Sequence, residues 1–82
     1  MKPLAALLKS AGVTQEDAAK ALGKSQPAVS RIVNGTEVPD VADLKALARL
    51  LDVERGAVVA AWIAAAMQTA RKRAAKLAAS DK

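Results

Sequence analysis

The sequence contains no cysteine and no histidine among its 82 residues. It therefore has no side chains for a disulfide, for an ordinary structural zinc site, or for a thiol or imidazole catalytic group. The carboxylates are spread singly along the chain except at Glu16 and Asp17, and neighbouring helical residues point about 100° apart. That spacing gives no paired acid and base. We expect a protein that is not an enzyme and that needs no metal or other cofactor.

Large apolar residues are also scarce. Trp62 is the one aromatic residue, and 21 of the hydrophobic residues are alanines. A core built from so few large side chains is thin, and small domains of this kind gain stability from disulfides, metals or oligomerisation. Oligomerisation is the one of these that the composition leaves open.

Long apolar segments are missing as well. The longest stretch without a charged residue, Gly56 to Ala70, has 15 residues, fewer than the ~20 that a membrane-spanning helix needs. The first residues lack the apolar run and cleavage pattern of a signal peptide. The basic residues gather at one end of the last helical segment rather than along one face, which disfavours binding to a membrane surface. We expect a cytoplasmic protein without membrane contact.

Apolar residues recur at helical spacing along the whole chain, and no stretch alternates as a strand does. The predicted fold class is therefore all-α. With N-caps included, the predicted helices cover about 3–11, 14–22, 25–33, 40–51 and 54–79. We expect residues 1–52 to form one compact four-helix domain, and residues 53–82 to form a long C-terminal helix with a basic end.

Start and stop signals support the first two helices. Pro3 suits a first helical turn, and Gly12 ends that helix. Thr14 and Asp17 have the spacing of a capping box, and Gly23 ends the second helix. The first helix is expected to bury Leu4, Leu7, Leu8 and Ala11.

The next two helices carry similar signals. Ser25 is an N-cap candidate, and Pro27 falls in the first turn, where a missing N–H costs no hydrogen bond. Asn34 and Gly35 form a helix-ending turn, and Asp40 caps the fourth helix. The fourth helix is expected to bury Val41, Leu44, Leu47, Leu50 and Leu51.

Two short helices joined by a tight, glycine-containing turn are the sequence form of a helix-turn-helix. The segment QEDAAKALGKSQPAVSRIVNG, from residue 15 to residue 35, resembles the Cro and phage-repressor type of helix-turn-helix family. Ala19 is small where two helices cross, Gly23 permits the turn, and Val29 and Ile32 fill the core, at the family's spacing. The resemblance extends over the first four helices and implies a lambda-repressor-like domain that binds double-stranded DNA.

Helical geometry divides the third helix into an inner and an outer side. Val29, Ile32 and Val33 lie on one side; the other carries Gln26, Pro27, Ser30, Arg31 and Asn34. Glutamine and arginine pair bidentately with adenine and guanine edges, and the resemblance places base contacts here. We predict base reading by Gln26, Pro27, Ser30 and Arg31, against the alternative that these are solvated residues. Pro27 departs from the family pattern and offers a thymine-methyl contact or a stiffened first turn.

The resemblance also places phosphate contacts at Gln15 and Asn34, with Lys24 and Ser25 nearby. For Asn34 a C-cap role is the alternative. Charge is divided unevenly along the chain: +3 over residues 1–35, −2 over residues 36–70, and +4 over residues 71–82. Arg71, Lys72 and Arg73 are candidates for flanking phosphate contacts, or form a solvated helix end.

The last helix carries more apolar surface than a unit of about fifty residues can cover. Its stripe begins at Val58 and ends at Leu77. Symmetric pairing of this helix would match the two-fold symmetry of operator half-sites. We predict a homodimer through Val59, Trp62, Ile63, Ala66, Met67 and Ala70.

These observations predict a dimeric transcription regulator, most simply a repressor, that reads a palindromic DNA site and acts in the cytoplasm at the nucleoid. The alternative is an antitoxin that regulates its own operon through the helix-turn-helix and binds a toxin through its last helix. Co-purification of an unrelated small protein would distinguish the two.

Overall fold

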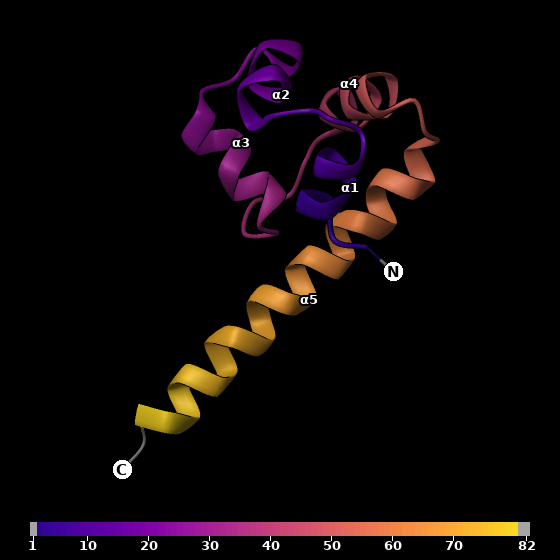
Figure 1. The fold of residues 1–82 in the computed structure, drawn as a ribbon. Helices are drawn as coiled ribbons and strands as arrows, with labels where there is room; N and C mark the ends of the chain where they lie inside the picture. Colours follow the sequence, from indigo (N-terminus) through magenta and orange to yellow (C-terminus); the bar gives the residue numbers. More distant parts are fainter. Residues whose placement is uncertain (1, 81–82) are drawn as a thin grey trace.

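The computed structural model describes residues 2–80, with side chains to residue 79, and it is all-α over that range, as predicted. Four short helices gather at one end, and a long fifth helix leaves them as a stalk (Figure 1). The helices are α1 (Leu4–Ser10), α2 (Gln15–Leu22), α3 (Gln26–Val33), α4 (Val41–Leu51) and α5 (Arg55–Ser80).

The N-cap of α2 is the predicted capping box. The Asp17 N–H donates to Thr14 Oγ1 over 3.0 Å, and the Thr14 N–H donates to the Asp17 carboxylate over 3.1 Å. That backbone hydrogen bond, together with the Thr14 hydroxyl, lowers the pKa of Asp17. Gly23 ends the helix in the left-handed conformation, with φ of 66°, which glycine adopts without steric cost.

Helices α3 and α4 also begin at the predicted caps. Ser25 Oγ accepts a hydrogen bond from the Ala28 N–H at 3.3 Å, and Pro27 lies in the first turn. Asp40 and Asp43 form a second capping box at the start of α4. Local capping chemistry therefore sets three of the helix starts.

Two predicted core residues are exposed instead. Ala11 follows the end of α1 as its C-cap and has left the helical stripe. Val41 is 58% exposed, because α4 turns Asp43 inward against Lys24. The buried side of α4 carries Asp43 together with residues 47, 48 and 51.

The first half of α5 belongs to the same packed unit as the other helices. Val58, Ala61 and Ala65 are buried, and α5 packs on both α1 and α4. The expected boundary between residues 52 and 53 therefore has no matching break in the core. The core consists of Leu4, Leu8, Ala18, Ala19, Val29, Ile32, Val33, Leu47, Ala48, Leu51, Val58, Ala61 and Ala65.

The second half of α5 forms the stalk. Every side chain from residue 71 to residue 79 is exposed, and the molecule is longer than it is wide, at 46 × 25 × 23 Å. Over the described residues, no helix combines the length and the apolar character that crossing a bilayer requires.

Candidate nucleic-acid interface

Helices α2 and α3 are joined by a three-residue turn, at residues 23–25. The Lys24 N–H donates to the Ala19 carbonyl oxygen over 3.1 Å, which closes the end of α2 before α3 begins. Ala19 is 8% exposed where it packs in the core, and the inner residues Val29 and Ile32 are fully buried. The sequence predicted this packing, which fixes α3 on the body of the domain.

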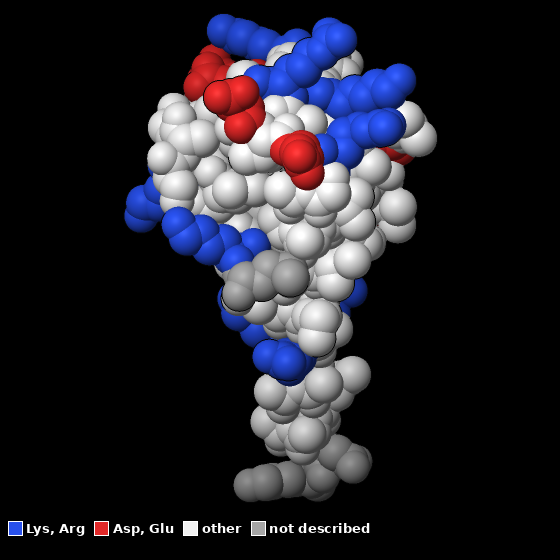
Figure 2. Space-filling view, turned by 90° about the vertical axis from the view of Figure 1, so that its right-hand side faces the viewer, with Lys and Arg blue, Asp and Glu red and all other residues white. Residues whose placement is uncertain are grey.

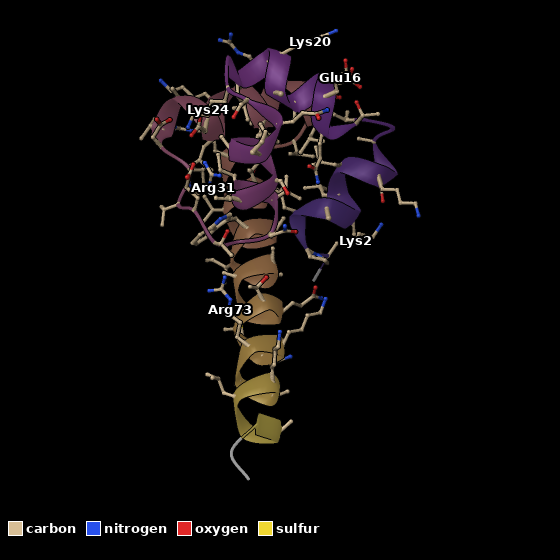
Figure 3. All side chains as sticks on the ribbon, turned by 90° about the vertical axis from the view of Figure 1, so that its left-hand side faces the viewer. Lys2, Glu16, Lys20, Lys24, Arg31 and Arg73 are labelled. Atoms are coloured by element: carbon tan, nitrogen blue, oxygen red, sulfur yellow. The ribbon has the colours of Figure 1, made fainter. Side chains whose placement is uncertain are left out.

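The outer side of α3 faces solvent along most of its length (Figure 3). Gln26, Pro27, Arg31 and Asn34 are exposed. Ser30 differs, since it is half-buried and its hydroxyl lies 3.4 Å from the Asn34 side-chain nitrogen. An exposed row of polar side chains on a rigid helix has the geometry needed to enter a DNA major groove.

Arg31 has a carboxylate partner. Its Nε donates a hydrogen bond to Glu37 Oε1 over 3.3 Å, and its side chain is 55% exposed. A guanidinium has five N–H donors, so this contact uses one of them. The terminal nitrogens are the ones that approach the O6 and N7 of guanine in a bidentate contact.

The loop after α3 holds Glu37 in position. The Thr36 and Glu37 N–H groups both donate to the Arg31 carbonyl oxygen, at 2.9 and 3.2 Å. The Trp62 indole N–H donates to the Glu37 carbonyl oxygen over 3.0 Å. Sequence reasoning missed Glu37, because it lies six positions from Arg31 across a turn and helical periodicity does not relate the two.

The end of α3 also touches α5. The Thr69 hydroxyl donates to the Asn34 carbonyl oxygen, and Gly35 lies directly against the α5 backbone. A Cβ atom added at Gly35 would lie 2.4 Å from Ala66 Cα. Asn34 is the C-cap of α3, and its side chain is still exposed, so the structure is compatible with both of its predicted roles.

Lys24 forms an ion pair inside the domain. Its ammonium lies 2.7 Å from the Asp43 carboxylate, and the two side chains are 31% and 4% exposed. The hydrogen bond to Asp43 raises the pKa of Lys24. Burial alone would raise the pKa of Asp43, but the hydrogen bonds from Lys24 and from the Asp40 N–H outweigh it and hold that pKa below its ordinary value. Lys24 thus joins the helix-turn-helix turn to α4.

The other predicted phosphate contacts lie at helix starts. Gln15 is the first residue of α2, Ser25 is the N-cap of α3, and both are exposed. Backbone N–H groups at such positions attract anions. In α2, however, Glu16 and Asp17 occupy the first turn and add negative charge beside Gln15.

The basic residues Arg71, Lys72 and Arg73 are exposed on the stalk. Figure 3 shows Arg73 on the stalk below Arg31, toward the same edge of the view. Figure 2 shows another side of the molecule, where carboxylates and basic residues mix at the upper end and only basic residues interrupt the uncharged surface below them.

The six residues predicted to form the dimer face separate into two groups. Val59, Ile63, Met67 and Ala70 are exposed, whereas Trp62 and Ala66 are half-buried on the core side. Ala61 and Ala65 make the buried contacts instead. The sequence pattern missed them because small alanines are not distinctive as core residues in an alanine-rich helix.

An apolar pocket of about 170 Å³ lies beside the exposed group, between α5 and the start of α4. Its lining residues are Val38, Pro39, Leu44, Val59, Trp62 and Ile63. Among the described residues, no cluster of three or more acidic side chains could hold a metal ion.

The family model described as helix-turn-helix matches residues 4–57, which contain α1 to α4 and the start of α5. No curated protein and no solved structure matches the chain.

Proposed function

This chain belongs to the Cro and phage-repressor type of the helix-turn-helix family and is a DNA-binding transcription regulator; from that premise we propose that it is a dimeric repressor of a palindromic operator. The observation that carries the proposal is α3, whose inner side is fully buried while Gln26 and Arg31 stand exposed on its outer side. The protein acts in the cytoplasm, at the nucleoid.

Gln26 and Arg31 make the main base contacts in this proposal, with adenine and guanine respectively. Pro27 contributes an apolar contact, and Ser30 contributes less because it is half-buried. Specificity then rests on two side chains about 1.4 turns apart on one helix, a distance of roughly 7.5 Å along its axis.

Phosphate contacts hold α3 in the groove. Gln15, Ser25 and Asn34 supply them from the ends of α2 and α3. The ion pair with Asp43 occupies the Lys24 ammonium, so Lys24 contributes less to phosphate binding than these three residues. Arg71, Lys72 and Arg73 extend the contacts along the flanking backbone.

Dimerisation through the exposed residues Val59, Ile63, Met67 and Ala70 gives the two-fold symmetry that a palindromic site requires. The exposed stalk also leaves room for the antitoxin alternative, in which a different protein covers the same face of α5. Co-expression with the neighbouring gene products followed by co-purification tests that alternative.

Selection of binding sites from random duplex DNA tests the main proposal. We expect the enriched site to be an inverted repeat. An enriched site without symmetry would contradict the dimer, and an absence of enrichment would contradict specific binding.

The first testable prediction concerns Arg31→Ala. Loss of a bidentate base contact should weaken binding to the selected site by roughly 1 to 3 kcal/mol and relax the preference at one base pair in each half-site. Arg49→Ala, on exposed α4 surface, is the matched control and should leave that preference intact. Unchanged affinity and preference in Arg31→Ala would contradict the reading role.

A further inference from the structure

One side of α5 is apolar and exposed from its second turn to its last. The residues on this side, which we name the outer face, follow one another at intervals of three or four positions, so they form one continuous strip. Val59, Ile63, Met67 and Leu77 are 37%, 45%, 50% and 70% exposed. The outer face consists of Val59, Ile63, Met67, Ala70, Ala74 and Leu77.

The outer face is nearly symmetric about Gln68. Val59 and Leu77 lie nine positions on either side of that centre. Between them, Ile63 of one helix would lie opposite Ala74 of a second helix that runs in the reverse direction, and Met67 would lie opposite Ala70. A second α5 running antiparallel therefore sets each large inner residue against an alanine, whereas a parallel one sets methionine on methionine and alanine on alanine. Alternation of large and small residues gives the closer packing.

The two ends of the outer face differ in a complementary way. At one end, Val59 and Ile63 border the apolar pocket that Val38, Pro39 and Leu44 complete. At the other end, Leu77 lies in the last turn of α5 and is 70% exposed. Antiparallel pairing brings the partner's Leu77 to this pocket, and the reverse contact forms at the symmetric site.

The charges favour the same orientation. A parallel pair would align Arg71, Lys72, Arg73 and Lys76 of one copy with those of the other, and like charges at close range repel. In an antiparallel pair these residues lie beside the first half of the partner's α5 instead, so this repulsion is avoided. Glu37 and Asp40 flank the pocket residues Val38 and Pro39 in the sequence. Glu37 is paired with Arg31, so the exposed Asp40 is the carboxylate left for the partner's basic residues.

We propose that two copies of the chain pair through antiparallel α5 helices, with Leu77 of each copy seated in the pocket lined by Val38, Leu44, Val59 and Trp62 of the other. This inference rests on the proposed dimer and adds its geometry. Each pocket is then completed by a residue of the second copy.

Cysteine cross-linking distinguishes the two orientations, because the chain has no cysteine of its own. Positions 59 and 77 are 18 residues apart, or about 27 Å along the helix, and a disulfide requires Cα atoms within about 7 Å. We expect Val59→Cys mixed with Leu77→Cys to give a covalent heterodimer on oxidation. Each variant alone should stay uncrosslinked, which is the internal control.

Three results would overturn the inference, and they are distinguishable. A disulfide-linked dimer of Leu77→Cys alone would mean parallel helices, and a dimer in sedimentation that gives no cross-link in the mixture would mean a different interface. Either result leaves the dimer of the proposed function standing. A wild-type chain that sediments as a monomer, with and without DNA, would remove the dimer as well.

A second measurement reports the same proximity without requiring a disulfide to form. Trp62 is the only tryptophan, so a nitroxide on a copy carrying Trp62→Phe and Leu77→Cys can quench only the Trp62 of an unlabelled partner. We expect quenching in the mixture, and none when the same double variant is added without its label. Unquenched emission from a mixture that sediments as a dimer would contradict the antiparallel arrangement.

Discussion

Arg31 and Glu37 form a pair whose geometry bears on base recognition. The carboxylate contacts Nε, and the loop that carries it is fixed at the Arg31 carbonyl oxygen and at Trp62. A guanidinium held at its base loses less conformational freedom when its outer nitrogens bind a guanine edge. If Arg31 reads a base as proposed, Glu37 is thus a positioning residue for it.

Glu37→Ala should therefore have two opposite effects. Binding to unrelated duplex DNA should strengthen, because the net positive charge rises by one, while the preference at the base pair read by Arg31 should fall several-fold. Competition binding with single-base variants of the selected site, at one fixed salt concentration, measures both.

Glu54→Ala is the matched control, since it makes the same charge change outside the α3 loop. It should strengthen non-specific binding and leave the base preference unchanged. An equal change of preference in both variants would refute the positioning role of Glu37.

Asp43 makes the stability of the fold depend on pH. Its pKa in the folded protein lies below the ordinary value of about 4. The ionised carboxylate therefore stabilises the fold above that value, and this stabilisation is lost as the pH falls through the folded-state pKa. Asp43→Asn should lower the urea midpoint at neutral pH, and its midpoint should fall less than that of the wild type between about pH 5 and pH 2.

Asp17→Asn provides the comparison for this pH effect. This substitution removes a different carboxyl group whose pKa is lowered, in the exposed capping box of α2. It leaves the ion pair between Lys24 and Asp43 intact. Parallel pH profiles for wild type and Asp43→Asn would show that the ion pair contributes nothing measurable to stability.

At the scale of the helices, capping residues made α2, α3 and α4 predictable. A cap joins residues three positions apart, such as Thr14 and Asp17. Both partners therefore belong to one short stretch of sequence and can be recognised together. Contacts between residues far apart in the sequence could not be predicted in this way. Lys24 and Asp43 are 19 positions apart, and Trp62 and Glu37 are 25 apart. The inward turn of Asp43, and with it the exposure of Val41, follows from such a distant contact.

The packing of the α3 loop on α5 gives a prediction at the same scale. Gly35→Ala places a Cβ atom 2.4 Å from the α5 backbone at a residue with φ of 78°. Backbone strain of this kind costs roughly 1 to 3 kcal/mol before any steric clash is counted, so the thermal midpoint should drop by several degrees. Affinity for the selected site should also fall, because the end of α3 moves.

Gly56→Ala is the control for glycine replacement. It lies in the first turn of α5 with no atom near its added Cβ, and alanine favours the helix by up to about 1 kcal/mol over glycine. We expect unchanged or raised stability. A Gly35→Ala variant as stable as the wild type would mean that the loop does not depend on close contact with Ala66.

At the scale of the whole molecule, the question is whether the basic residues of the stalk contact DNA phosphates or stay solvated. Replacement of Arg71, Lys72 and Arg73 by alanine should weaken binding about equally for selected and random DNA if the stalk reaches the phosphates. Each lost contact should reduce the slope of log K against log salt by roughly 0.9.

Replacement of Lys45, Arg49 and Arg55 by alanine removes the same charge from exposed positions in the middle segment and is the matched control. Its salt slope should stay close to that of the wild type. An unaltered slope in the stalk variant would assign those residues to a solvated helix end.

In the proposed dimer, helix α5 takes part in two equilibria at once. Its inner residues Val58, Ala61 and Ala65 form part of the core of the domain. From residue 71 to residue 79 the same helix has only exposed side chains, and isolated helical segments of about ten residues are marginal in water. Pairing would supply the missing support, so helix formation in the stalk and association would reinforce each other. Occupancy of a two-fold site would then rise more steeply than in proportion to protein abundance, giving a small regulator a threshold response without a bound signal molecule.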